Sequence, residues 1–327
     1  MNILIVGGAG YVGCHATRLL ERAGHTIWVY DSLIAGHRSA VSPGKLIVGD
    51  LADRALVEKT LTERKIDAVM HFAAFALVGE SVADPAKYYY NNVVLTIGLL
   101  DAMRATGVNK FVFSSSTATY GVPSRVPIVE DEPQRPINPY GFTKLVIEEA
   151  LADYAKAYGL GYAALRYFNA AGASPEGDIG EDHTPESHLI PLVLQVALGQ
   201  RDKITIFGED YPTPDGTCIR DYVHVNDLGD AHLRALELIQ PGKGIELNLG
   251  TGRGYSVREV IEACRKITGH KIPAVIGERR PGDPPELIAD ASKARQVLGW
   301  KPQYAEIDEI VKTAWRWHQS HPQGYGD

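Results

Sequence analysis

The chain has 327 residues, of which 45% are apolar and 22% are charged, and its formal net charge is −7. A chain of this length buries a substantial core and forms one large or two modest domains. The acidic balance argues against a nucleic-acid binder or a membrane-surface protein, and no run reaches the roughly 18 apolar residues that a membrane span needs.

The first half of the sequence alternates candidate strands with helical patterns. The candidate strands are residues 2–6, 26–30, 46–48, 67–72, 110–114 and 162–168. This alternation is typical of an α/β fold with a doubly wound parallel sheet, the Rossmann arrangement. Ligands of such folds bind at the carboxyl ends of the strands, so we expect functional residues there.

The first strand runs directly into a glycine-rich turn that precedes a helical pattern. Gly7 and Gly10 would allow a tight turn and a close approach to a pyrophosphate, and Gly13 would let the helix pack near the sheet. The N–H groups at the start of that helix suit phosphate oxygens. Asp31 ends the second strand, about 20 residues after the glycines, where a carboxylate can bind the 2′-hydroxyl of a cofactor ribose. Because its charge would repel a 2′-phosphate, the sequence predicts NAD rather than NADP.

A helix is expected from about residue 85 to residue 106, with Asp84 and Pro85 at its start. Its expected buried stripe comprises Tyr89, Val93, Thr96, Leu100 and Met103. Asn92 lies beside this stripe. Because an unpaired buried amide is costly, its partner should be either the backbone or a cofactor.

Tyr140 and Lys144 are four residues apart on a second predicted helix, so they share one face. Asn138 suits the N-cap of this helix, and Pro139 suits its first position. A cation roughly 4–6 Å away would lower the phenol pKa from its usual value of about 10. We therefore expect Tyr140 to act as a base and Ser116, at the end of a strand, to hold the same substrate oxygen. The spacing alone is common in a chain with 16 tyrosines, so this prediction depends on its context.

The character of the sequence changes at about residue 172. A loop is expected over residues 173–187, followed by a helix at 189–198, a strand at 204–207 and a turn-rich stretch at 208–216. We predict a larger cofactor-binding domain over residues 1–172 and a smaller α/β substrate domain over residues 173–327. Segments near 218–250 are expected to pack back on the first domain.

The sequence does not predict a disulfide, a metal-binding site or a signal peptide. Cysteines are few and scattered, so free thiols in a reducing cytoplasm are expected at Cys14, Cys218 and Cys264. The apolar start is short and has no basic flank, so it is not expected to be a signal peptide. No metal site is predicted, because the candidate ligands are judged too dispersed: His71, His183, His188 and His224.

Motifs from nearly the whole chain carry a family resemblance. They are GGAGYVG at 7–13, Asp31, residues 49–51, 71–74, 89–93, 113–116, 138–144, 166–169 and 206–212, residues 215–224, and residues 279–283. Together they resemble the extended short-chain dehydrogenase/reductase superfamily and, within it, the UDP-glucose 4-epimerase family. The stretch from Phe207 to His224 is the most specific of them.

The resemblance implies a set of NAD contacts and a set of UDP-sugar contacts. The NAD set is Gly7, Gly10, Tyr11, Val12, Gly13, Asp31, Asp50, Leu51, Phe72, Asn92, Ser114, Tyr140, Lys144 and Tyr167. The UDP-sugar set is Ser116, Tyr140, Asn169, His188, Leu189, Phe207, Arg220, Arg280, Asp283 and Leu287. Within these sets Tyr140, Lys144 and Ser116 would be catalytic, and Arg220 and Arg280 would clamp the diphosphate.

The implied reaction is the reversible 4-epimerisation of a UDP-hexose by transient hydride transfer to tightly bound NAD. One alternative is the same chemistry on another UDP-sugar: N-acetylated, a pentose or a uronate. Another is a sugar-nucleotide 4,6-dehydratase, disfavoured because Thr117 and Ala118 stand where its acid–base pair would be. A third is a non-catalytic NAD-binding scaffold, disfavoured by Ser116, Tyr140 and Lys144 occurring together.

Three positions depart from the pattern of many relatives. Ala76 replaces a lysine that would contact the cofactor, and His188 replaces an asparagine before the Leu-x-Pro sequence. Leu287 is intermediate between a tyrosine that narrows the sugar pocket and a small residue that widens it.

The resemblance also implies a homodimer formed through two helices, here near residues 85–106 and 140–158.

Overall fold

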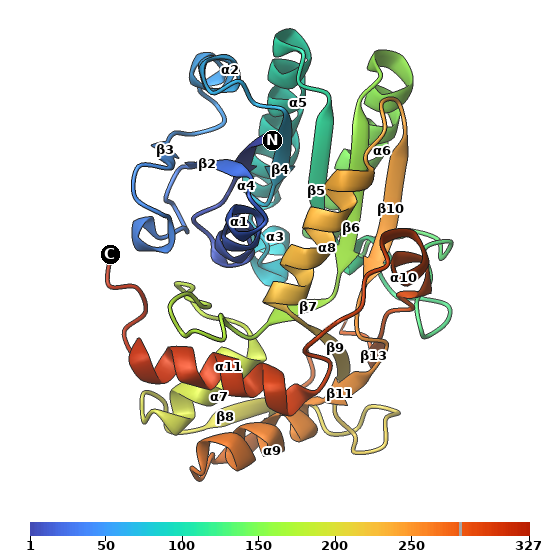
Figure 1. Cartoon of the computed structure of the whole chain (residues 1–327). Coiled ribbons are helices and arrows are strands. Elements are labelled where there is room, and N and C mark those ends of the chain that lie inside the picture. Colours follow the sequence, from blue (N-terminus) through green and yellow to red (C-terminus); the bar gives the residue numbers. More distant parts are fainter. Residues whose placement is uncertain (281–282) are drawn as a thin grey trace.

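The computed structural model describes residues 1–280 and 283–327. Figure 1 shows a larger part, in which helices cover a central sheet, and a smaller part that contains helix α11 (Ile307–Ser320). None of the helices in the described part of the chain is long and apolar enough to cross a membrane.

The larger part is built on a seven-stranded sheet in which all neighbouring strands are parallel. In spatial order the strands are β10 (Gly244–Leu249), β6 (Gly161–Tyr167), β5 (Lys110–Ser116), β4 (Ala68–His71), β1 (Asn2–Val6), β2 (Thr26–Asp31) and β3 (Leu46–Val48). The doubly wound α/β prediction is confirmed, and the six predicted strands match β1 to β6 within two residues at each end. β10 comes from far along the sequence and extends the sheet beside β6.

Helices cover both faces of this sheet. Helices α1 (Tyr11–Arg22) and α8 (Val225–Leu238) pack on one face, and α2 (Arg54–Glu63), α5 (Leu95–Thr106) and α6 (Pro139–Tyr158) pack on the other. Strand β1 shows why both faces are buried: Ile3 and Ile5 belong to the core under α1 and α8, whereas Leu4 and Val6 belong to the opposite core. Successive side chains of a strand point to opposite faces, so an uninterrupted apolar run fills both cores.

The predicted helix at 85–106 contains an irregularity. It begins as α4 (Pro85–Tyr88), passes through one stretch of π-helix (Tyr89–Val94) and continues as α5. The wider π turn changes the rotation per residue, so the expected stripe fails at its start. Tyr89 is 39% exposed, whereas Thr96, Leu100 and Met103 are buried.

The smaller part has two short sheets and its own apolar core. In the first sheet, β9 (Ile219–His224) is flanked by β7 (Asn169–Ala171), β11 (Gly254–Ser256) and β13 (Glu286–Leu287); the second pairs β8 (Ile204–Phe207) with β12 (Ala274–Gly277). Helices α7 (Leu189–Ala197), α9 (Val257–Thr268) and α11 complete the core. β7 follows β6 directly, so the chain enters this part from the carboxyl edge of the large sheet.

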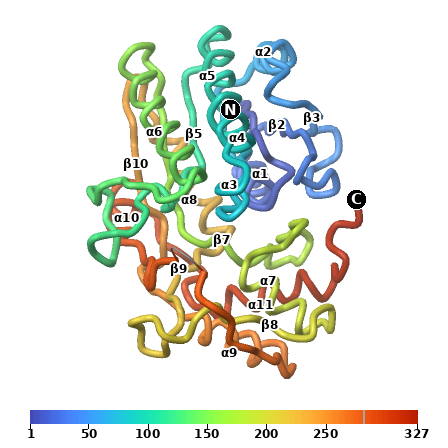
Figure 2. The backbone as a smooth tube through the Cα atoms, turned by 180° about the vertical axis from the view of Figure 1, so that it is seen from behind, coloured from blue at the N-terminus to red at the C-terminus, as the bar shows by residue number. Residues whose placement is uncertain are grey.

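The remaining elements are short. They are α3 (Val78–Ala83), α10 (Ser292–Leu298), which packs on β10 and α8, and two 3-10 turns at Arg38–Ala40 and Thr117–Thr119. Figure 2, seen from behind, shows α3, α4, α5 and α6 on one side of the molecule.

Candidate active site

In the glycine-rich turn between β1 and α1, Gly7 and Gly13 have no room for a side chain, whereas Gly10 has. A Cβ on Gly7, whose φ is +81°, would lie 2.4 Å from the backbone nitrogen of Ala73, and one on Gly13 would lie 2.2 Å from the carbonyl oxygen of Gly7. A Cβ on Gly10 would meet nothing nearer than 3.5 Å among the described residues. Gly10 is the N-cap of α1, so the open space lies where the first N–H groups of that helix are unpaired. This arrangement fits a pyrophosphate group.

Asp31 lies at the end of β2 and fixes the glycine turn from one side. Its two carboxylate oxygens accept hydrogen bonds of 2.9 Å from the backbone N–H groups of Ala9 and Leu33. Burial raises the pKa of Asp31, and these two hydrogen bonds oppose the rise. Each carboxylate oxygen has a second lone pair, so Asp31 can still accept a hydrogen bond from a ribose hydroxyl.

The side chain of Tyr11 is directed away from the turn. Its hydroxyl donates a 2.6 Å hydrogen bond to the carbonyl of Gly172, in the segment that follows β7. Only the backbone of Tyr11 is therefore placed to contact a ligand at the glycine turn. Val12 is partly buried against the core on the same face as α1.

Two further predicted cofactor residues follow β3. Asp50 is exposed, and its side chain accepts a 2.8 Å hydrogen bond from the N–H of Ala52, while its carbonyl accepts one from the Tyr30 hydroxyl. Leu51 is partly buried beside the core under α2. Both residues stand at the carboxyl edge of the sheet, as expected.

Asn92 has its partners within the protein. Its Oδ1 accepts from the N–H of Phe75 at 3.0 Å, and its Nδ2 donates to the carbonyl of Phe75 at 3.0 Å and to Thr143 Oγ1 at 3.2 Å. Asn91 donates to the same Oδ1. All four hydrogen-bonding positions of the amide are therefore filled, which is the backbone alternative of the prediction. Asn92 holds the loop that follows Phe72, whose ring lies 4.8 Å from that of His232.

Strand β5 and helix α6 bring the predicted catalytic residues together. Asn138 caps α6 by accepting from the N–H of Gly141 at 2.9 Å, and Pro139 is the first helical residue, as predicted. Lys144 Nζ donates to the carbonyl of Ser114 at 2.7 Å and lies 5.9 Å from the centre of the Tyr140 ring. The Ser116 side chain is close enough to Tyr140 that its hydrogen-bonding influence lowers the pKa of the phenol, and its Oγ accepts a 3.1 Å hydrogen bond from the N–H of Ala118.

The ligand-free protein does not have the low tyrosine pKa that the sequence suggested. Burial raises the pKa of Tyr140, and the hydrogen bond with Ser116 only partly offsets the rise. The expected effect of Lys144 fails because this lysine is itself buried. Burial lowers the pKa of Lys144 to about 7, against the opposing effect of Glu148. Desolvation is therefore the largest cause of both pKa shifts.

A buried ion pair behind Lys144 was not predicted. Glu148, one turn after Lys144, lies 2.5 Å from the guanidinium of Arg166 and also accepts from Ser115. Both members of the pair are buried. The only signal in the sequence is the i, i+4 spacing of Lys144 and Glu148, which suggests an ordinary surface pair.

Ser114 links this group to the next strand. Its hydroxyl lies 2.5 Å from that of Tyr167, the last residue of β6. Asn169 then begins β7 and pairs with Tyr222 in β9. The predicted nicotinamide and sugar residues thus follow each other along one edge.

The predicted nucleotide residues form a second group on the smaller part. The Arg280 guanidinium lies 4.3 Å from the centre of the Phe207 ring. Arg220 in β9 forms an ion pair with Asp283 and stands opposite Leu287 of β13. A planar cation on an aromatic ring and a second arginine nearby provide the donors that a diphosphate needs.

His188 and its neighbours contradict the expectation that the histidines are dispersed. The rings of His183 and His188 are 5.1 Å apart, and both face the carboxylates of Glu181 and Glu186. Burial alone would lower the pKa of His188, but the two carboxylates outweigh it and raise the pKa to about 11. The imidazole predicted to contact a sugar is thus engaged in this cluster, while Leu189 begins α7 and packs on the smaller core.

Known proteins share this sequence and fold. The model of the NAD dependent epimerase/dehydratase family matches residues 3–250. A UDP-glucose 4-epimerase from Lactobacillus helveticus is 54% identical over 329 aligned residues, which cover 100% of each chain. The crystal structure of a UDP-glucose 4-epimerase from Brucella ovis in complex with NAD has a TM-score of 0.93 and 52% identity, covering 96% of this chain and 97% of that one. The structure of a UDP-glucose 4-epimerase from Bifidobacterium longum with NAD+ and UDP has a TM-score of 0.95 and 40% identity, covering 99% and 100%. The resemblance is confirmed: the chain belongs to the NAD dependent epimerase/dehydratase family and, within it, to the UDP-glucose 4-epimerases.

Proposed function

We propose that this chain is an NAD-dependent epimerase that reversibly inverts C4 of a UDP-hexose, interconverting UDP-glucose and UDP-galactose. The observation that carries the proposal is the Ser116–Tyr140 pair beside Lys144, at the sheet edge that also bears the open glycine turn. A hydroxyl pair of this kind can hold one sugar oxygen and exchange its proton. The family membership limits the chemistry to nucleotide sugars with NAD.

Bound NAD supplies an acceptor and donor for hydride at C4, and the protein supplies binding and proton transfer. Tyr140 takes the proton of the 4-hydroxyl and returns it to the other epimer, with Ser116 hydrogen-bonded to the same oxygen. Lys144 supplies positive charge near the phenolate. Gly10, the first turn of α1 and Asp31 would hold the pyrophosphate and the ribose of NAD.

The sugar must turn between the two hydride transfers, so its grip should come from the nucleotide end. Phe207 offers a flat apolar surface for the uracil, and Arg220 and Arg280 offer guanidinium donors for the diphosphate. Arg220 is already held by Asp283 and by the carbonyl of Ile219. An arginine has five N–H donors, so this anchoring leaves donors for phosphate oxygens.

Acceptance of other UDP-sugars remains the second candidate, and Leu287 is the residue that bears on it. Its intermediate size supports a pocket that favours a hexose without excluding an N-acetyl group. Comparable turnover of UDP-N-acetylglucosamine and UDP-glucose would establish the wider pocket. The dehydratase alternative is weaker, because Thr117 and Ala118 cannot act as an acid–base pair.

Incubation with UDP-galactose tests the proposal. We expect UDP-glucose as the product, NAD retained on the protein and no net NADH. Tyr140→Phe should lose about 10²- to 10⁴-fold in kcat, the usual contribution of an acid–base group, and keep its NAD. Tyr304→Phe is the control, because Tyr304 packs on the smaller core and belongs to none of the proposed sites. Near-normal turnover of Tyr140→Phe, or a 6-deoxy product from the unmodified protein, would overturn the assignment.

We also propose that the chain forms a homodimer through α6 and the segment from α3 to α5. These helices pack against each other and expose several large apolar side chains: Val78, Val82, Tyr89, Tyr90, Val94, Phe142 and Tyr158. The helices that carry these residues lie on one side of the molecule (Figure 2), and a contiguous group of exposed apolar side chains favours association. Sedimentation should give a dimer that Val94→Arg weakens, whereas a monomeric wild type would refute this assembly.

We assign the protein to the cytoplasm. The support is its three free and buried cysteines, which suit a reducing compartment.

A further inference from the structure

Four side chains from the loop between β7 and α7 converge on one point. Glu181, His183, Glu186 and His188 each offer one atom, and these four atoms all lie within 4.8 Å of one another. The residues follow an E-x-H-x-x-E-x-H spacing, and His188 is the N-cap of α7. Of the four, only His188 belongs to a set that the family resemblance implies, the UDP-sugar set; the other three belong to neither the NAD set nor the UDP-sugar set.

Each histidine of the cluster contacts both carboxylates at distances near those of ligands that share a small cation. His188 Nδ1 lies 2.9 Å from Glu181 Oε1 and 2.9 Å from Glu186 Oε1. His183 Nδ1 lies 3.3 Å from Glu181 Oε1 and 3.6 Å from Glu186 Oε2. Tetrahedral zinc with bonds of about 2.0–2.2 Å places neighbouring ligands about 3.3–3.6 Å apart, so the two His183 contacts match this spacing and the two His188 contacts are shorter.

Hydrogen bonding within the cluster leaves two buried atoms without a partner. Among the described residues, neither Glu181 Oε1 nor His183 Nδ1 has a hydrogen-bond partner of acceptable geometry, although both are buried and close to opposite charges. The Glu181 side chain is only 5% exposed. Leaving such groups unpaired is costly, so these two atoms are available to a cation, whereas His188 Nδ1 is hydrogen-bonded to Glu186 Oε1 at 2.9 Å and would exchange that bond for the metal.

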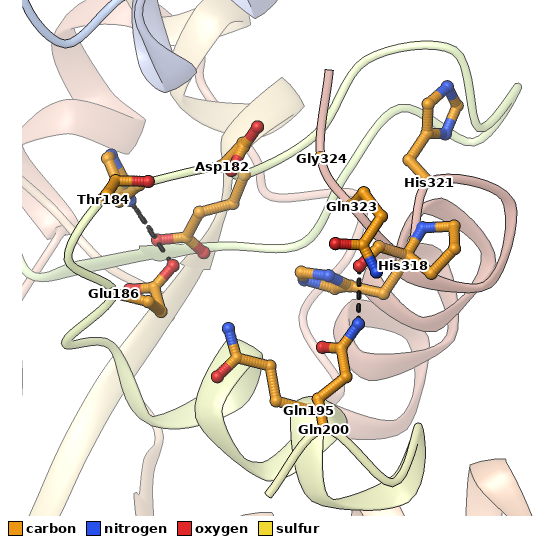
Figure 3. A pocket seen from close by; sticks show the side chains of 12 residues that line it. Asp182, Thr184, Glu186, Gln195, Gln200, His318, His321, Gln323 and Gly324 are labelled. Carbon is orange, nitrogen blue, oxygen red and sulfur yellow. Dashed lines mark hydrogen bonds and ion pairs between the residues drawn. The ribbon is translucent and has the colours of Figure 1, made fainter. Parts of the chain in front are cut away.

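The surroundings hold these ligands in place. The Glu186 carboxylate accepts from the backbone N–H groups of Ser187 at 2.7 Å and His188 at 2.8 Å, which is the kind of outer support that orients a metal ligand. The His183 ring meets the Tyr11 ring edge-on at 6.1 Å, so the cluster abuts the first residue of α1. The cluster borders a cavity of about 320 Å³, whose other walls come from α7, α11 and the C-terminal segment. Figure 3 shows Glu186 on one side of this cavity and His318 and His321 on the other.

We propose that Glu181, His183, Glu186 and His188 bind one zinc ion. Two imidazole nitrogens disfavour magnesium and calcium, which prefer oxygen ligands, and zinc binds such mixed sites more tightly than manganese, iron(II) or cobalt. Four protein ligands leave no open position, so the ion is structural rather than catalytic. It ties the loop after β7 to the start of α7, next to the turn of α1 that Tyr11 anchors to Gly172.

Metal analysis of the untagged, full-length protein tests the site directly. After dialysis against chelator, addition of zinc and removal of the excess, we expect about one zinc per chain in the wild type. His183→Ala and Glu186→Gln should each lose most of it. His321→Gln is the matched control, because His321 lines the same cavity without belonging to the cluster. Zinc should also raise the Tm of the wild type and of the control, but not of the two variants.

A cobalt(II) titration tests the site without any substitution, so its result does not depend on whether a variant folds. Added to the unmodified chelator-treated protein, cobalt should give the intense visible absorption of a tetrahedral site, and an equivalent of zinc should abolish it. Zinc-free wild type with no cobalt spectrum would overturn the proposal, leaving two glutamate–histidine ion pairs. Full zinc content in His183→Ala and Glu186→Gln would overturn it as well.

Discussion

Replacing Lys144 with methionine removes a buried ammonium group and keeps a long unbranched side chain. Lys144 is 4% exposed, and burial lowers its pKa from 10.5 to about 7. The unfolded chain therefore holds a proton here up to about pH 10.5, whereas the folded chain releases it above about pH 7. Since the folded state binds fewer protons than the unfolded state in this window, its stability rises with pH.

The pKa difference sets the size of this effect. At about 1.36 kcal/mol per pKa unit, the drop from 10.5 to about 7 limits the total to about 5 kcal/mol. Because the folded state is still half-protonated near pH 7, the gain between pH 7 and pH 9 is about 2 kcal/mol.

Urea denaturation of the NAD-free protein at pH 7, 8 and 9 measures this gain. Other groups titrate in both proteins, so the difference between wild type and Lys144→Met isolates Lys144. We expect the wild type to gain about 2 kcal/mol relative to the variant across this range. Parallel dependences on pH in the two proteins would refute the reasoning.

Four further substitutions separate cofactor binding, substrate binding and stability. Gly10→Ala should weaken NAD binding and lower the free energy of unfolding of the NAD-free protein by less than about 1 kcal/mol. Gly13→Ala should destabilise the NAD-free protein more, because its Cβ would meet the preceding turn. Equal losses of stability in the two variants would contradict this. Arg220→Met should raise KM for the UDP-sugar roughly 10- to 100-fold, equivalent to losing one charge-assisted hydrogen bond, with NAD content unchanged; an unaltered KM would remove Arg220 from the site. Glu148→Gln leaves Arg166 buried without its partner and should cost about 3–5 kcal/mol in urea denaturation, so a change below about 1 kcal/mol would show that the pair is dispensable.

The sequence predicted those parts of the fold that depend on neighbouring residues alone. The strands of the first half, the cap of α6 by Asn138 and Pro139, and the turn after β1 all follow from periodicity, capping and glycine placement. Strand β10 could not be placed in this way, because only tertiary packing sets it beside β6. The π turn was missed because Tyr89 is aromatic although exposed, so the sequence continues the apolar period across the turn.

Electrostatics was the weaker part of the sequence prediction. The Tyr140–Lys144 spacing placed the two side chains correctly, but spacing carries no information about burial, and burial decides both pKa values. The prediction that the histidines are dispersed was wrong for a different reason. His183 and His188 lie on an irregular loop, where no helical or strand period reveals that their rings meet.

Turnover of UDP-galactose that carries deuterium on C4 tests the central claim most directly. If hydride leaves C4 and returns to the same carbon from within one closed site, the UDP-glucose product should keep its deuterium, and the protein should release no NADH. Mass spectrometry of the product sugar reads this outcome. Loss of the label to solvent, or a lasting accumulation of free NADH, would contradict an internal and reversible hydride transfer.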